Sequence, residues 1–352
     1  MKTRLWGLIV LALVIVTAVV YTVFQGNQPT QVELNGFLGG EKSGLFSNPE
    51  FQDYIKDEYG ITLNYRIDGS FDMVQGDIEG QDYLFPSSQL ALELYQQLNR
   101  PSVEDDIVLN TPIVLYSRRL VTDALEQEGV VTVRDGVHYV NMVKLAEMIA
   151  NETSWADIGI PELYGNVLVD TTDPNASNSG NMFLGLLANS LNNNQVVNTS
   201  TVDAILPQIR DIYQAIGFMQ TSSSDMFNQF LRQGVGAYPI IAGYENQLLE
   251  FSKIQPDVYE QVRDQIVILY PEPTVWSSHV LIGLTDQSEV LIDALLDPQV
   301  QDLAWREHGF RTVVSGASNE SNYDIPGLAS EVTQIMPMPD IETMLLLMEA
   351  VK

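Results

Sequence analysis

A chain of 352 residues is long enough for two domains of ordinary size, each with its own core. Its content of 45% hydrophobic and 9% aromatic residues excludes a largely disordered chain. The formal net charge of −29 disfavours nucleic acid and anionic membrane surfaces as partners, because both are polyanions that the chain would repel. The lack of cysteine excludes disulfides, thiolate catalysis and Cys-based metal sites.

The first 25 residues have the pattern of a membrane segment. Lys2 and Arg4 precede an apolar run over residues 5–24, which as a helix is about 30 Å long and matches the hydrocarbon core of a bilayer. The basic start predicts a cytoplasmic N-terminus, with the rest of the chain outside the cytoplasm. Residues 20–26 form a poor cleavage site. The sequence therefore favours a single-pass anchor in the cell membrane over a cleaved signal that would release a secreted protein.

Three loops follow predicted strands early in the chain, and each is a candidate ligand contact. A glycine-rich loop over residues 36–44 follows a strand at 31–37, residues 69–72 follow a strand at 61–67, and Ser88 follows the segment 81–85. Ligands of open α/β sheets bind at such carboxyl ends of strands. The glycine-rich loop matches neither GxGxxG nor GxxxxGK[ST], so no nucleotide is predicted. The candidates here are Gly40, Lys42, Ser43, Ser70 and Ser88, with helix capping as the alternative role for Ser88.

The strongest candidate for a binding loop lies in the middle of the chain. Small hydroxyl and amide residues follow an apolar strand at 166–169, and Gly180 then permits a tight turn into an apolar helix over 182–191. The first N–H groups of such a helix have no partners within it, and the helix dipole adds a preference for anions. Helix capping is the alternative role. The candidate ligand-binding residues of this loop are Ser177, Asn178, Ser179, Gly180 and Asn181.

Tyr244 and Glu245 end a predicted strand at 237–242 and begin the next helix. The phenol can donate a hydrogen bond and the carboxylate can accept one, so both are candidates to line a pocket. If Glu245 points inward, the ligand should carry donors or a cation, which argues against a bare oxyanion. The alternative is a carboxylate that stabilises the helix dipole.

Several of these segments resemble bacterial extracellular solute-binding proteins of the type 2 periplasmic class. The resemblance implies an α/β fold of two lobes joined by crossovers near residues 107–116 and 265–274. It places lobe one at residues 26–112 and 270–352, and lobe two at residues 113–269. The segments that carry it are Thr172-Asp173-Pro174 with Ser177-Asn178-Ser179-Gly180, the loop 39–44, the segment 152–165, and Asp297-Pro298-Gln299-Val300-Gln301 with Gly309-Phe310-Arg311.

The resemblance implies a membrane-tethered, extracytoplasmic protein whose lobes close over a small polar solute and which docks on the membrane subunits of an ABC-type transporter. The alternative is a membrane-anchored envelope interaction or sensory module without a transport role. An enzyme is not expected, because the chain contains no HExxH, GxSxG or Ser-x-x-Lys motif and no cysteine nucleophile. Its three histidines, His138, His279 and His308, are too scattered to indicate a metal cluster, and no cofactor is expected.

Overall fold

The computed structural model describes residues 29–313 and 320–352. The membrane anchor expected over residues 1–25 lies outside these ranges. Within them, no helix combines the length and apolarity that a membrane crossing requires.

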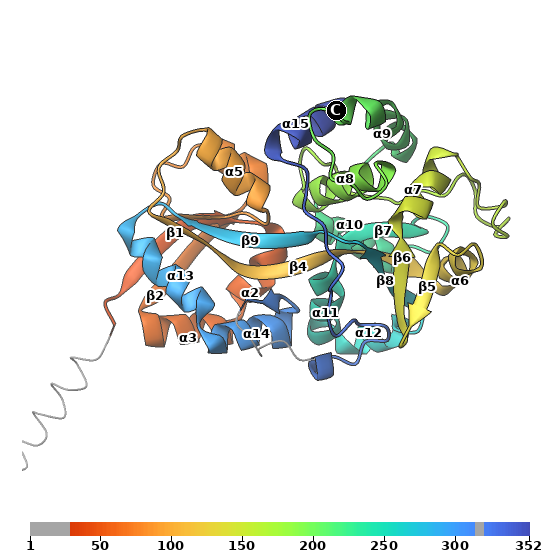
Figure 1. Ribbon diagram of the computed structural model, residues 1–352. Coiled ribbons are helices and arrows are strands. Elements are labelled where there is room, and N and C mark those ends of the chain that lie inside the picture. The colour runs from red at the N-terminus through yellow and green to blue at the C-terminus, as the bar shows by residue number, and fades with distance from the viewer. Residues whose placement is uncertain (1–28, 314–319) are drawn as a thin grey trace, which may run out of the picture.

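The strands alternate with helices along the chain, as in the α/β fold that the sequence predicts (Figure 1). The strands are β1 (Val32–Leu38), β2 (Ile61–Ile67), β3 (Tyr83–Phe85), β4 (Glu104–Arg118), β5 (Val131–Arg134), β6 (Val137–Asn141), β7 (Ile240–Tyr244), β8 (Ile266–Glu272), β9 (Trp276–Gly283) and β10 (Arg311–Thr312). The α-helices are α2 (Ser43–Ser47), α3 (Pro49–Tyr59), α4 (Ser70–Gln75), α5 (Gln89–Gln97), α6 (Arg119–Gln127), α7 (Met142–Ala150), α8 (Asn178–Leu191), α9 (Val202–Ile216), α10 (Ser223–Arg232), α11 (Glu245–Ile254), α12 (Pro256–Val262), α13 (Glu289–Leu296), α14 (Pro298–His308) and α15 (Ile341–Ala350). Short 3₁₀ turns occur at η1 (Gly40–Lys42), η2 (Asp286–Ser288) and η3 (Glu320–Asn322).

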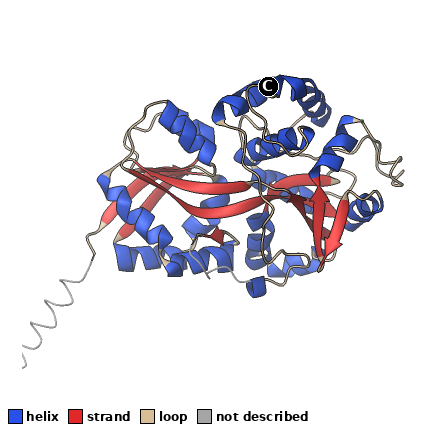
Figure 2. Cartoon of the chain, viewed as in Figure 1, coloured by secondary structure: helices blue, strands red, loops and turns tan. Residues whose placement is uncertain are grey.

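The long strand β4 belongs to two sheets and so joins two lobes. Its first part, from Glu104 to Pro112, pairs with β9 in a sheet that also contains β1, β2, β3 and β10. Its second part, from Ile113 to Arg118, pairs with β7 and β8, and β8 continues to β6 and β5. The strand continues through Pro112, which is the last residue of β4 that pairs with β9. In Figure 2, helices lie on both sides of the strands in each lobe.

Local sequence signals set several of the helix ends. Asn48 caps α3 by accepting from Glu50 N and Phe51 N, Pro49 occupies the first turn, and Gly60 ends the helix in the left-handed conformation with φ of 74°. Helix α14 repeats this pattern, with Asp297 as its N-cap and Gly309 at a φ of 70°. Such caps satisfy backbone groups that the helix itself leaves unpaired.

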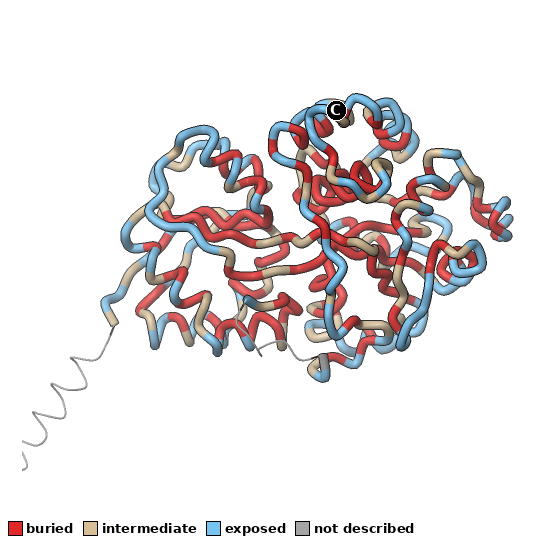
Figure 3. The backbone as a smooth tube through the Cα atoms, viewed as in Figure 1, coloured by how far each residue is buried: buried red, intermediate tan, exposed pale blue. Residues whose placement is uncertain are grey.

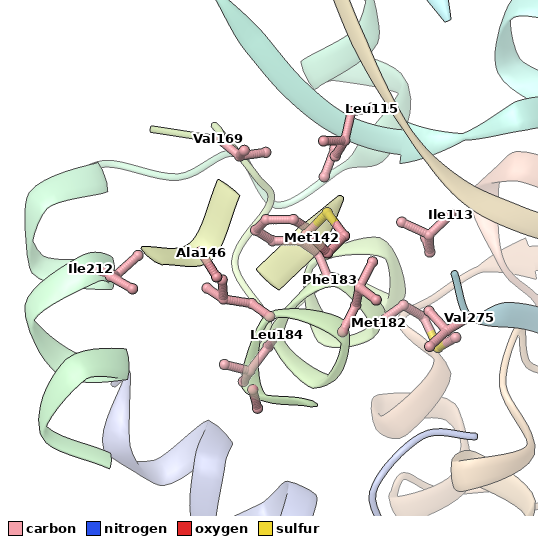
Figure 4. Packing of buried hydrophobic residues seen from close by; sticks show 14 of the residues in the cluster. Ile113, Leu115, Met142, Ala146, Val169, Met182, Phe183, Leu184, Ile212 and Val275 are labelled. Atoms are coloured by element: carbon pink, nitrogen blue, oxygen red, sulfur yellow. The ribbon is translucent and has the colours of Figure 1, made fainter. Parts of the chain in front are cut away.

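The core is continuous between the lobes. One buried cluster fills lobe one and another lies under α10 and α11, whereas the largest reaches from α4 and α5 to α8, α9 and α15. Figure 4 shows Met182 of α8 near Ile113 of β4 and Val275, at the point where the chain passes between the lobes. Burial is greatest along β3, β7, β8 and α8, whereas β2 and β5 at the sheet edges are largely exposed (Figure 3).

Residues 331–340, between Ser330 and α15, cross the molecule as a strap (Figure 1). Thr274 N donates to Gln334 O (3.0 Å) and Met336 N donates to Thr274 O (2.8 Å), which pairs the strap with the return crossover. Helix α15 then packs on α8 and α9 (Figure 1). The end of the chain therefore lies against elements from its middle.

Candidate functional site

A polar cavity of about 160 Å³ lies where loops from the two lobes face each other. One side is formed by residues 39–41 and 67–70, which follow β1 and β2. The other side is formed by residues 176–178 and 221–224, which lead into α8 and α10. The cavity thus lies at the carboxyl ends of strands, where ligands of open α/β sheets bind.

Three helices begin at this cavity. Their N-cap residues are Gly69 for α4, Ser177 for α8 and Ser222 for α10, and all three line the cavity. The first intrahelical bond of α8 is donated by Asn181 N to Ser177 O (3.1 Å), so the N–H groups before it have no partner within the helix. The positive ends of three helix dipoles therefore converge on one small space, an arrangement that favours an anionic group.

The charged residues that line the cavity place a second requirement on the ligand. Among the described residues that line it, none is basic, and two, Glu41 and Asp68, are acidic. Burial raises the pKa of Asp68, and its Oδ1 accepts a hydrogen bond from Gly69 N (2.9 Å). The helix ends supply donors and Asp68 supplies an acceptor, so the cavity suits a solute that carries both an anionic group and a hydrogen-bond donor.

Glu41 is neutralised from beneath the cavity by Lys42. The Lys42 side chain is fully buried, and its Nζ lies 2.5 Å from Glu41 Oε1, 2.7 Å from Ser87 Oγ and 3.0 Å from His279 Nδ1. Ser87 Oγ donates a further short hydrogen bond to Glu41. Burial raises the pKa of Glu41, but Lys42 and His279 outweigh it and hold that pKa well below its usual range. Lys42, which the sequence suggests as a ligand contact, is thus placed as the counter-ion of Glu41.

His279 completes this buried cluster in its neutral form. Burial, together with the charge of Lys42, lowers the pKa of His279 to about 4. Its Nδ1 faces the Lys42 ammonium group, whose three N–H donors meet Glu41, Ser87 and this ring nitrogen. Burial lowers the pKa of Lys42, and the attraction of the adjacent Glu41 carboxylate opposes that shift.

The neutral His279 predicts a pH dependence of stability. An unfolded chain protonates its histidine near pH 6.5, whereas the folded protein does so only near pH 4, so between these values the unfolded state binds more protons. Stability should therefore fall as the pH drops from 6.5 to 4, by up to about 1.4 kcal/mol per pH unit. Urea unfolding of the wild type and of His279→Asn, which keeps an acceptor for Lys42 but does not titrate, measures this slope. Equal slopes between pH 4.5 and 6.5 would contradict the assignment.

Asn178 joins the two lobes at the back of the cavity. Its Nδ2 donates to Ser87 O (2.9 Å) of lobe one and to the hydroxyl of Tyr244 (3.0 Å) of lobe two. Ser277 on β9 donates to the same Ser87 carbonyl (2.6 Å). Asn178 Oδ1 is buried, and within residues 29–313 and 320–352 it has no hydrogen-bond partner. This orphan acceptor, on a residue that lines the cavity, is available to a ligand donor.

The structure separates the sequence-predicted residues into two groups. Gly40, Ser70, Ser177 and Asn178 line the cavity, and Tyr244 meets it through Asn178. The other side chains do not line the cavity, and each is held by a contact of its own. Ser43 Oγ donates to Gly40 O (2.6 Å), Ser88 Oγ caps α5 by accepting from Leu90 N (3.1 Å), Ser179 Oγ lies 2.8 Å from Thr172 Oγ1, and Asn181 Nδ2 lies 3.0 Å from Met348 Sδ. Gly180 packs against Thr172, and α8 begins at Asn178, earlier than the glycine turn that the sequence suggests.

Glu245 faces away from the cavity. Its Oε2 accepts from Arg311 Nε (2.6 Å), and its Oε1 accepts from Arg311 Nη2 (2.8 Å) and from the Tyr270 hydroxyl (2.6 Å). The carboxylate is fully buried and fully paired. The sequence-based argument against an oxyanion required Glu245 to point inward, so this geometry removes it.

Two sources of polar cavity residues lie outside the loops that the sequence suggests. One is the turn of Thr221, Ser222, Ser223 and Ser224 at the start of α10, and the other is Asp68. Ser222 Oγ accepts from Asp225 N (3.3 Å), so the run of hydroxyl residues before an amphipathic segment is a readable helix-start signal. Asp68 directly follows β2 and precedes the predicted contact Ser70, and that position is the local signal for it.

The chain has two α/β lobes that share crossing strands, and a polar cavity lies between them at the N-termini of helices. This is the arrangement of the type 2 periplasmic-binding-protein fold. The solved structures that match include proteins described as a periplasmic binding protein and a putative extracellular solute-binding protein, binding proteins for sulfate and ferric ion, and a two-component system protein of signal transduction. No protein-family model and no curated protein sequence matches the chain.

Three of these structures illustrate the likeness. The periplasmic binding protein AfuA from Actinobacillus pleuropneumoniae, with fructose-6-phosphate bound, has a TM-score of 0.58 at 11% identity, over 91% of this chain and 97% of that one. The apo ferric ion-binding protein A from Pasteurella haemolytica has a TM-score of 0.56 at 14% identity, over 91% and 95%. The sulfate-binding protein SubI from Mycobacterium tuberculosis H37Rv has a TM-score of 0.55 at 14% identity, over 84% and 93%. At these identities the likeness concerns the fold.

Proposed function

We propose that this chain is an extracytoplasmic solute-binding protein whose two lobes close over a small solute with an anionic group. The observation that carries the proposal is the convergence of the N-termini of α4, α8 and α10 on one interlobe cavity without a basic side chain among its described lining residues. Helix N-termini bind anions through free N–H groups and the helix dipole. Asp68 and the orphan Asn178 Oδ1 select, in addition, a solute that carries hydrogen-bond donors.

In this proposal the lobes close on the solute, because the hydrogen-bond donors that contact it come from both lobes. In this proposal lobe one comprises residues 26–112 and 270–352, lobe two comprises residues 113–269, and α15 packs from the end of lobe one across onto α8 and α9. Gly40 and Ser70 approach from lobe one, and Ser177, Asn178 and Ser222 approach from lobe two. The solute contacts both sets only when the lobes are together, so binding shifts the population toward the closed form.

We also propose where the protein is located and what it docks on. Its structural neighbours include proteins described as periplasmic or extracellular, which supports an extracytoplasmic globular part. We propose that residues 1–25 anchor it in the membrane and that the closed form docks on the membrane subunits of an ABC-type transporter. Because the neighbours are described as binding proteins, we propose binding rather than catalysis.

A thermal-shift screen tests the proposal directly. The panel contains sulfate, phosphate, a sugar phosphate, acidic amino acids, neutral sugars and polyamines. A ligand present at about 100 times its Kd adds about 2.7 kcal/mol of stability, which is readily detected. We expect anionic solutes with hydroxyl or amino groups to stabilise the protein most. If no anion shifts the transition while a neutral or cationic class does, the ligand class is wrong. If no class shifts it, an interaction or sensory module is favoured.

A matched pair of variants at Ser222 tests the charge preference. Asp and Asn both cap helices as well as Ser does, so Ser222→Asp and Ser222→Asn should both leave α10 intact. Asp adds a negative charge to the cavity, whereas Asn reports the loss of the hydroxyl alone. Calorimetric titration with the best anion should show at least a tenfold weaker Kd for Asp than for Asn, which is about 1.4 kcal/mol. Equal affinities in the two variants would contradict an anionic ligand.

A further inference from the structure

A second hollow lies at the opposite end of α10 from the interlobe cavity. It has a volume of about 460 Å³, and three arginines line it: Arg118 at the end of β4, Arg119 at the start of α6, and Arg232 at the end of α10. The whole chain has only 17 basic residues against 46 acidic ones, so three in one hollow form a pronounced local concentration of positive charge. Figure 1 shows α6, α10 and α12 in lobe two, the elements around this hollow.

These arginines have unused donors. Across the described ranges, no carboxylate forms an ion pair within 4.0 Å of Arg118, Arg119 or Arg232, whereas Arg134 and Arg263 are both paired in this way. Among the described residues that line the hollow, Asp264 is the single acidic one, and it is exposed. The hollow is therefore positively charged as it stands.

Arg118 is held in place while the other two arginines remain exposed. Its Nη2 donates to Phe230 O (2.6 Å), and its guanidinium lies 4.3 Å from the centre of the Phe230 ring. Arg119 opens α6, whose first turn contains no acidic residue, so the N-terminus of α6 adds its N–H groups and dipole to the same place. A fixed arginine, two exposed arginines and a helix start are a donor set for a multiply charged anion.

The remaining lining residues define the other half of the ligand. Leu231, Val235 and Val262 are partly buried hydrophobic residues that line the hollow beside the arginines. A volume of about 460 Å³ lies within the usual range of small-molecule sites. Guanidinium groups match phosphate oxygens in a bidentate manner, and the apolar surface next to them requires an apolar body on the same molecule.

We infer that this hollow, lined by Arg118, Arg119 and Arg232, is a binding site for an organic phosphate, a phosphate group carried on an apolar body. The site is separate from the interlobe cavity and does not depend on the solute bound there. The same chemistry is offered by a soluble organic phosphate and by the headgroup of an acidic phospholipid. The experiment below separates these two sources.

Phenyl phosphate is the soluble probe, and the Ser222→Asp protein is the background, which suppresses anion binding in the interlobe cavity. Calorimetric titration should detect binding, and Arg119→Gln and Arg232→Gln should each weaken it at least tenfold. Both side chains are exposed, so both variants should fold. Arg210→Gln removes an exposed arginine on α9 with the same change of charge, and it should leave the Kd within twofold. Inorganic phosphate should bind more weakly than phenyl phosphate, and benzyl alcohol should not bind.

Vesicle flotation identifies the source. Vesicles that contain phosphatidic acid are compared with phosphatidylcholine vesicles, for the same background protein and for both arginine variants. If the protein floats with phosphatidic acid vesicles and either arginine variant abolishes this flotation, the ligand is a lipid headgroup. If the protein binds phenyl phosphate but does not float, the ligand is a soluble phosphate. The inference is overturned if neither probe binds, or if Arg119→Gln and Arg232→Gln bind the probe as tightly as Arg210→Gln does. The titrations and the flotation all use the Ser222→Asp background, so neither depends on anion binding in the interlobe cavity.

Discussion

Replacing Glu245 by alanine should lower the free energy of unfolding by about 3–5 kcal/mol, because the change leaves a buried arginine without its carboxylate. The Arg311 side chain is 10% exposed and that of Glu245 is fully buried. Burial lowers the pKa of Arg311, but the attraction of Glu245 more than reverses it, so the guanidinium stays charged. Urea unfolding of the wild type and of Glu245→Ala measures the loss.

Glu272→Ala is the matched control, since it also removes a glutamate from an arginine. Its partner Arg134 is 50% exposed, so water replaces the lost interaction and the expected change is within about 1 kcal/mol. Equal losses in Glu245→Ala and Glu272→Ala would refute the buried-charge explanation. The double variant Glu245→Gln with Arg311→Met removes both charges, and it should recover part of the stability that Glu245→Ala loses.

The same ion pair links distant parts of the chain. Arg311 Nη2 also donates to Ala329 O (2.6 Å) and its Nη1 donates to Ser330 O (3.2 Å), just before the strap that pairs with Thr274. Glu245 begins α11 directly after β7. The pair therefore fixes the start of the strap against lobe two, and its loss should loosen the strap as well as lower stability.

Much of the fold could be predicted because its signals are local. Strand, loop and helix alternate in the sequence, and the cap of α3 at Asn48 and its end at Gly60 are visible within a few residues. The two-lobed arrangement also followed from the resemblance of short segments to solute-binding proteins. The crossover expected near residues 107–116 lies within β4, which pairs with β9 up to Pro112 and with β7 beyond it.

The site was less predictable, because the fate of a charged side chain depends on partners far away in the sequence. Lys42 lies in a glycine-rich loop where the sequence suggests a ligand contact. In the folded protein its side chain is instead buried against Ser87 and His279. Glu245 ends a strand, as a ligand contact would, yet Arg311 is 66 residues further along the chain. Neither partner is marked by a pattern near the residue itself. By contrast, the hydroxyl residues around Ser222 are a local signal for the start of α10. Nothing in the sequence near them indicates that α10 begins at the cavity.

Gly180→Ala should destabilise the protein by about 3 kcal/mol or more, because α8 approaches Thr172 too closely for a side chain. A Cβ atom at Gly180 would lie 2.1 Å from Thr172 O and 2.7 Å from its carbonyl carbon, and the backbone there cannot move aside without shifting the helix. The sequence suggests a turn at this glycine, but the residue lies inside α8, so its need for glycine is close packing. The shift displaces Ser177 and Asn178, so anion binding should also weaken by about tenfold.

Gly185→Ala, in the same helix, separates this packing effect from helix propensity. Each change replaces a helical glycine by alanine, which intrinsic propensity favours by up to about 1 kcal/mol in a helix interior. A Cβ at Gly185 would lie 2.3 Å from Met338 Cε and 2.8 Å from its Sδ, at the far end of a flexible side chain, and 3.2 Å from Pro339 Cδ, which must give by a few tenths of an ångström. Rotation of Met338 relieves the contact, so Gly185→Ala should stay within about 1 kcal/mol of the wild type and keep its affinity for the anion. Similar losses in the two variants would show that contact with Thr172 does not dictate glycine at position 180.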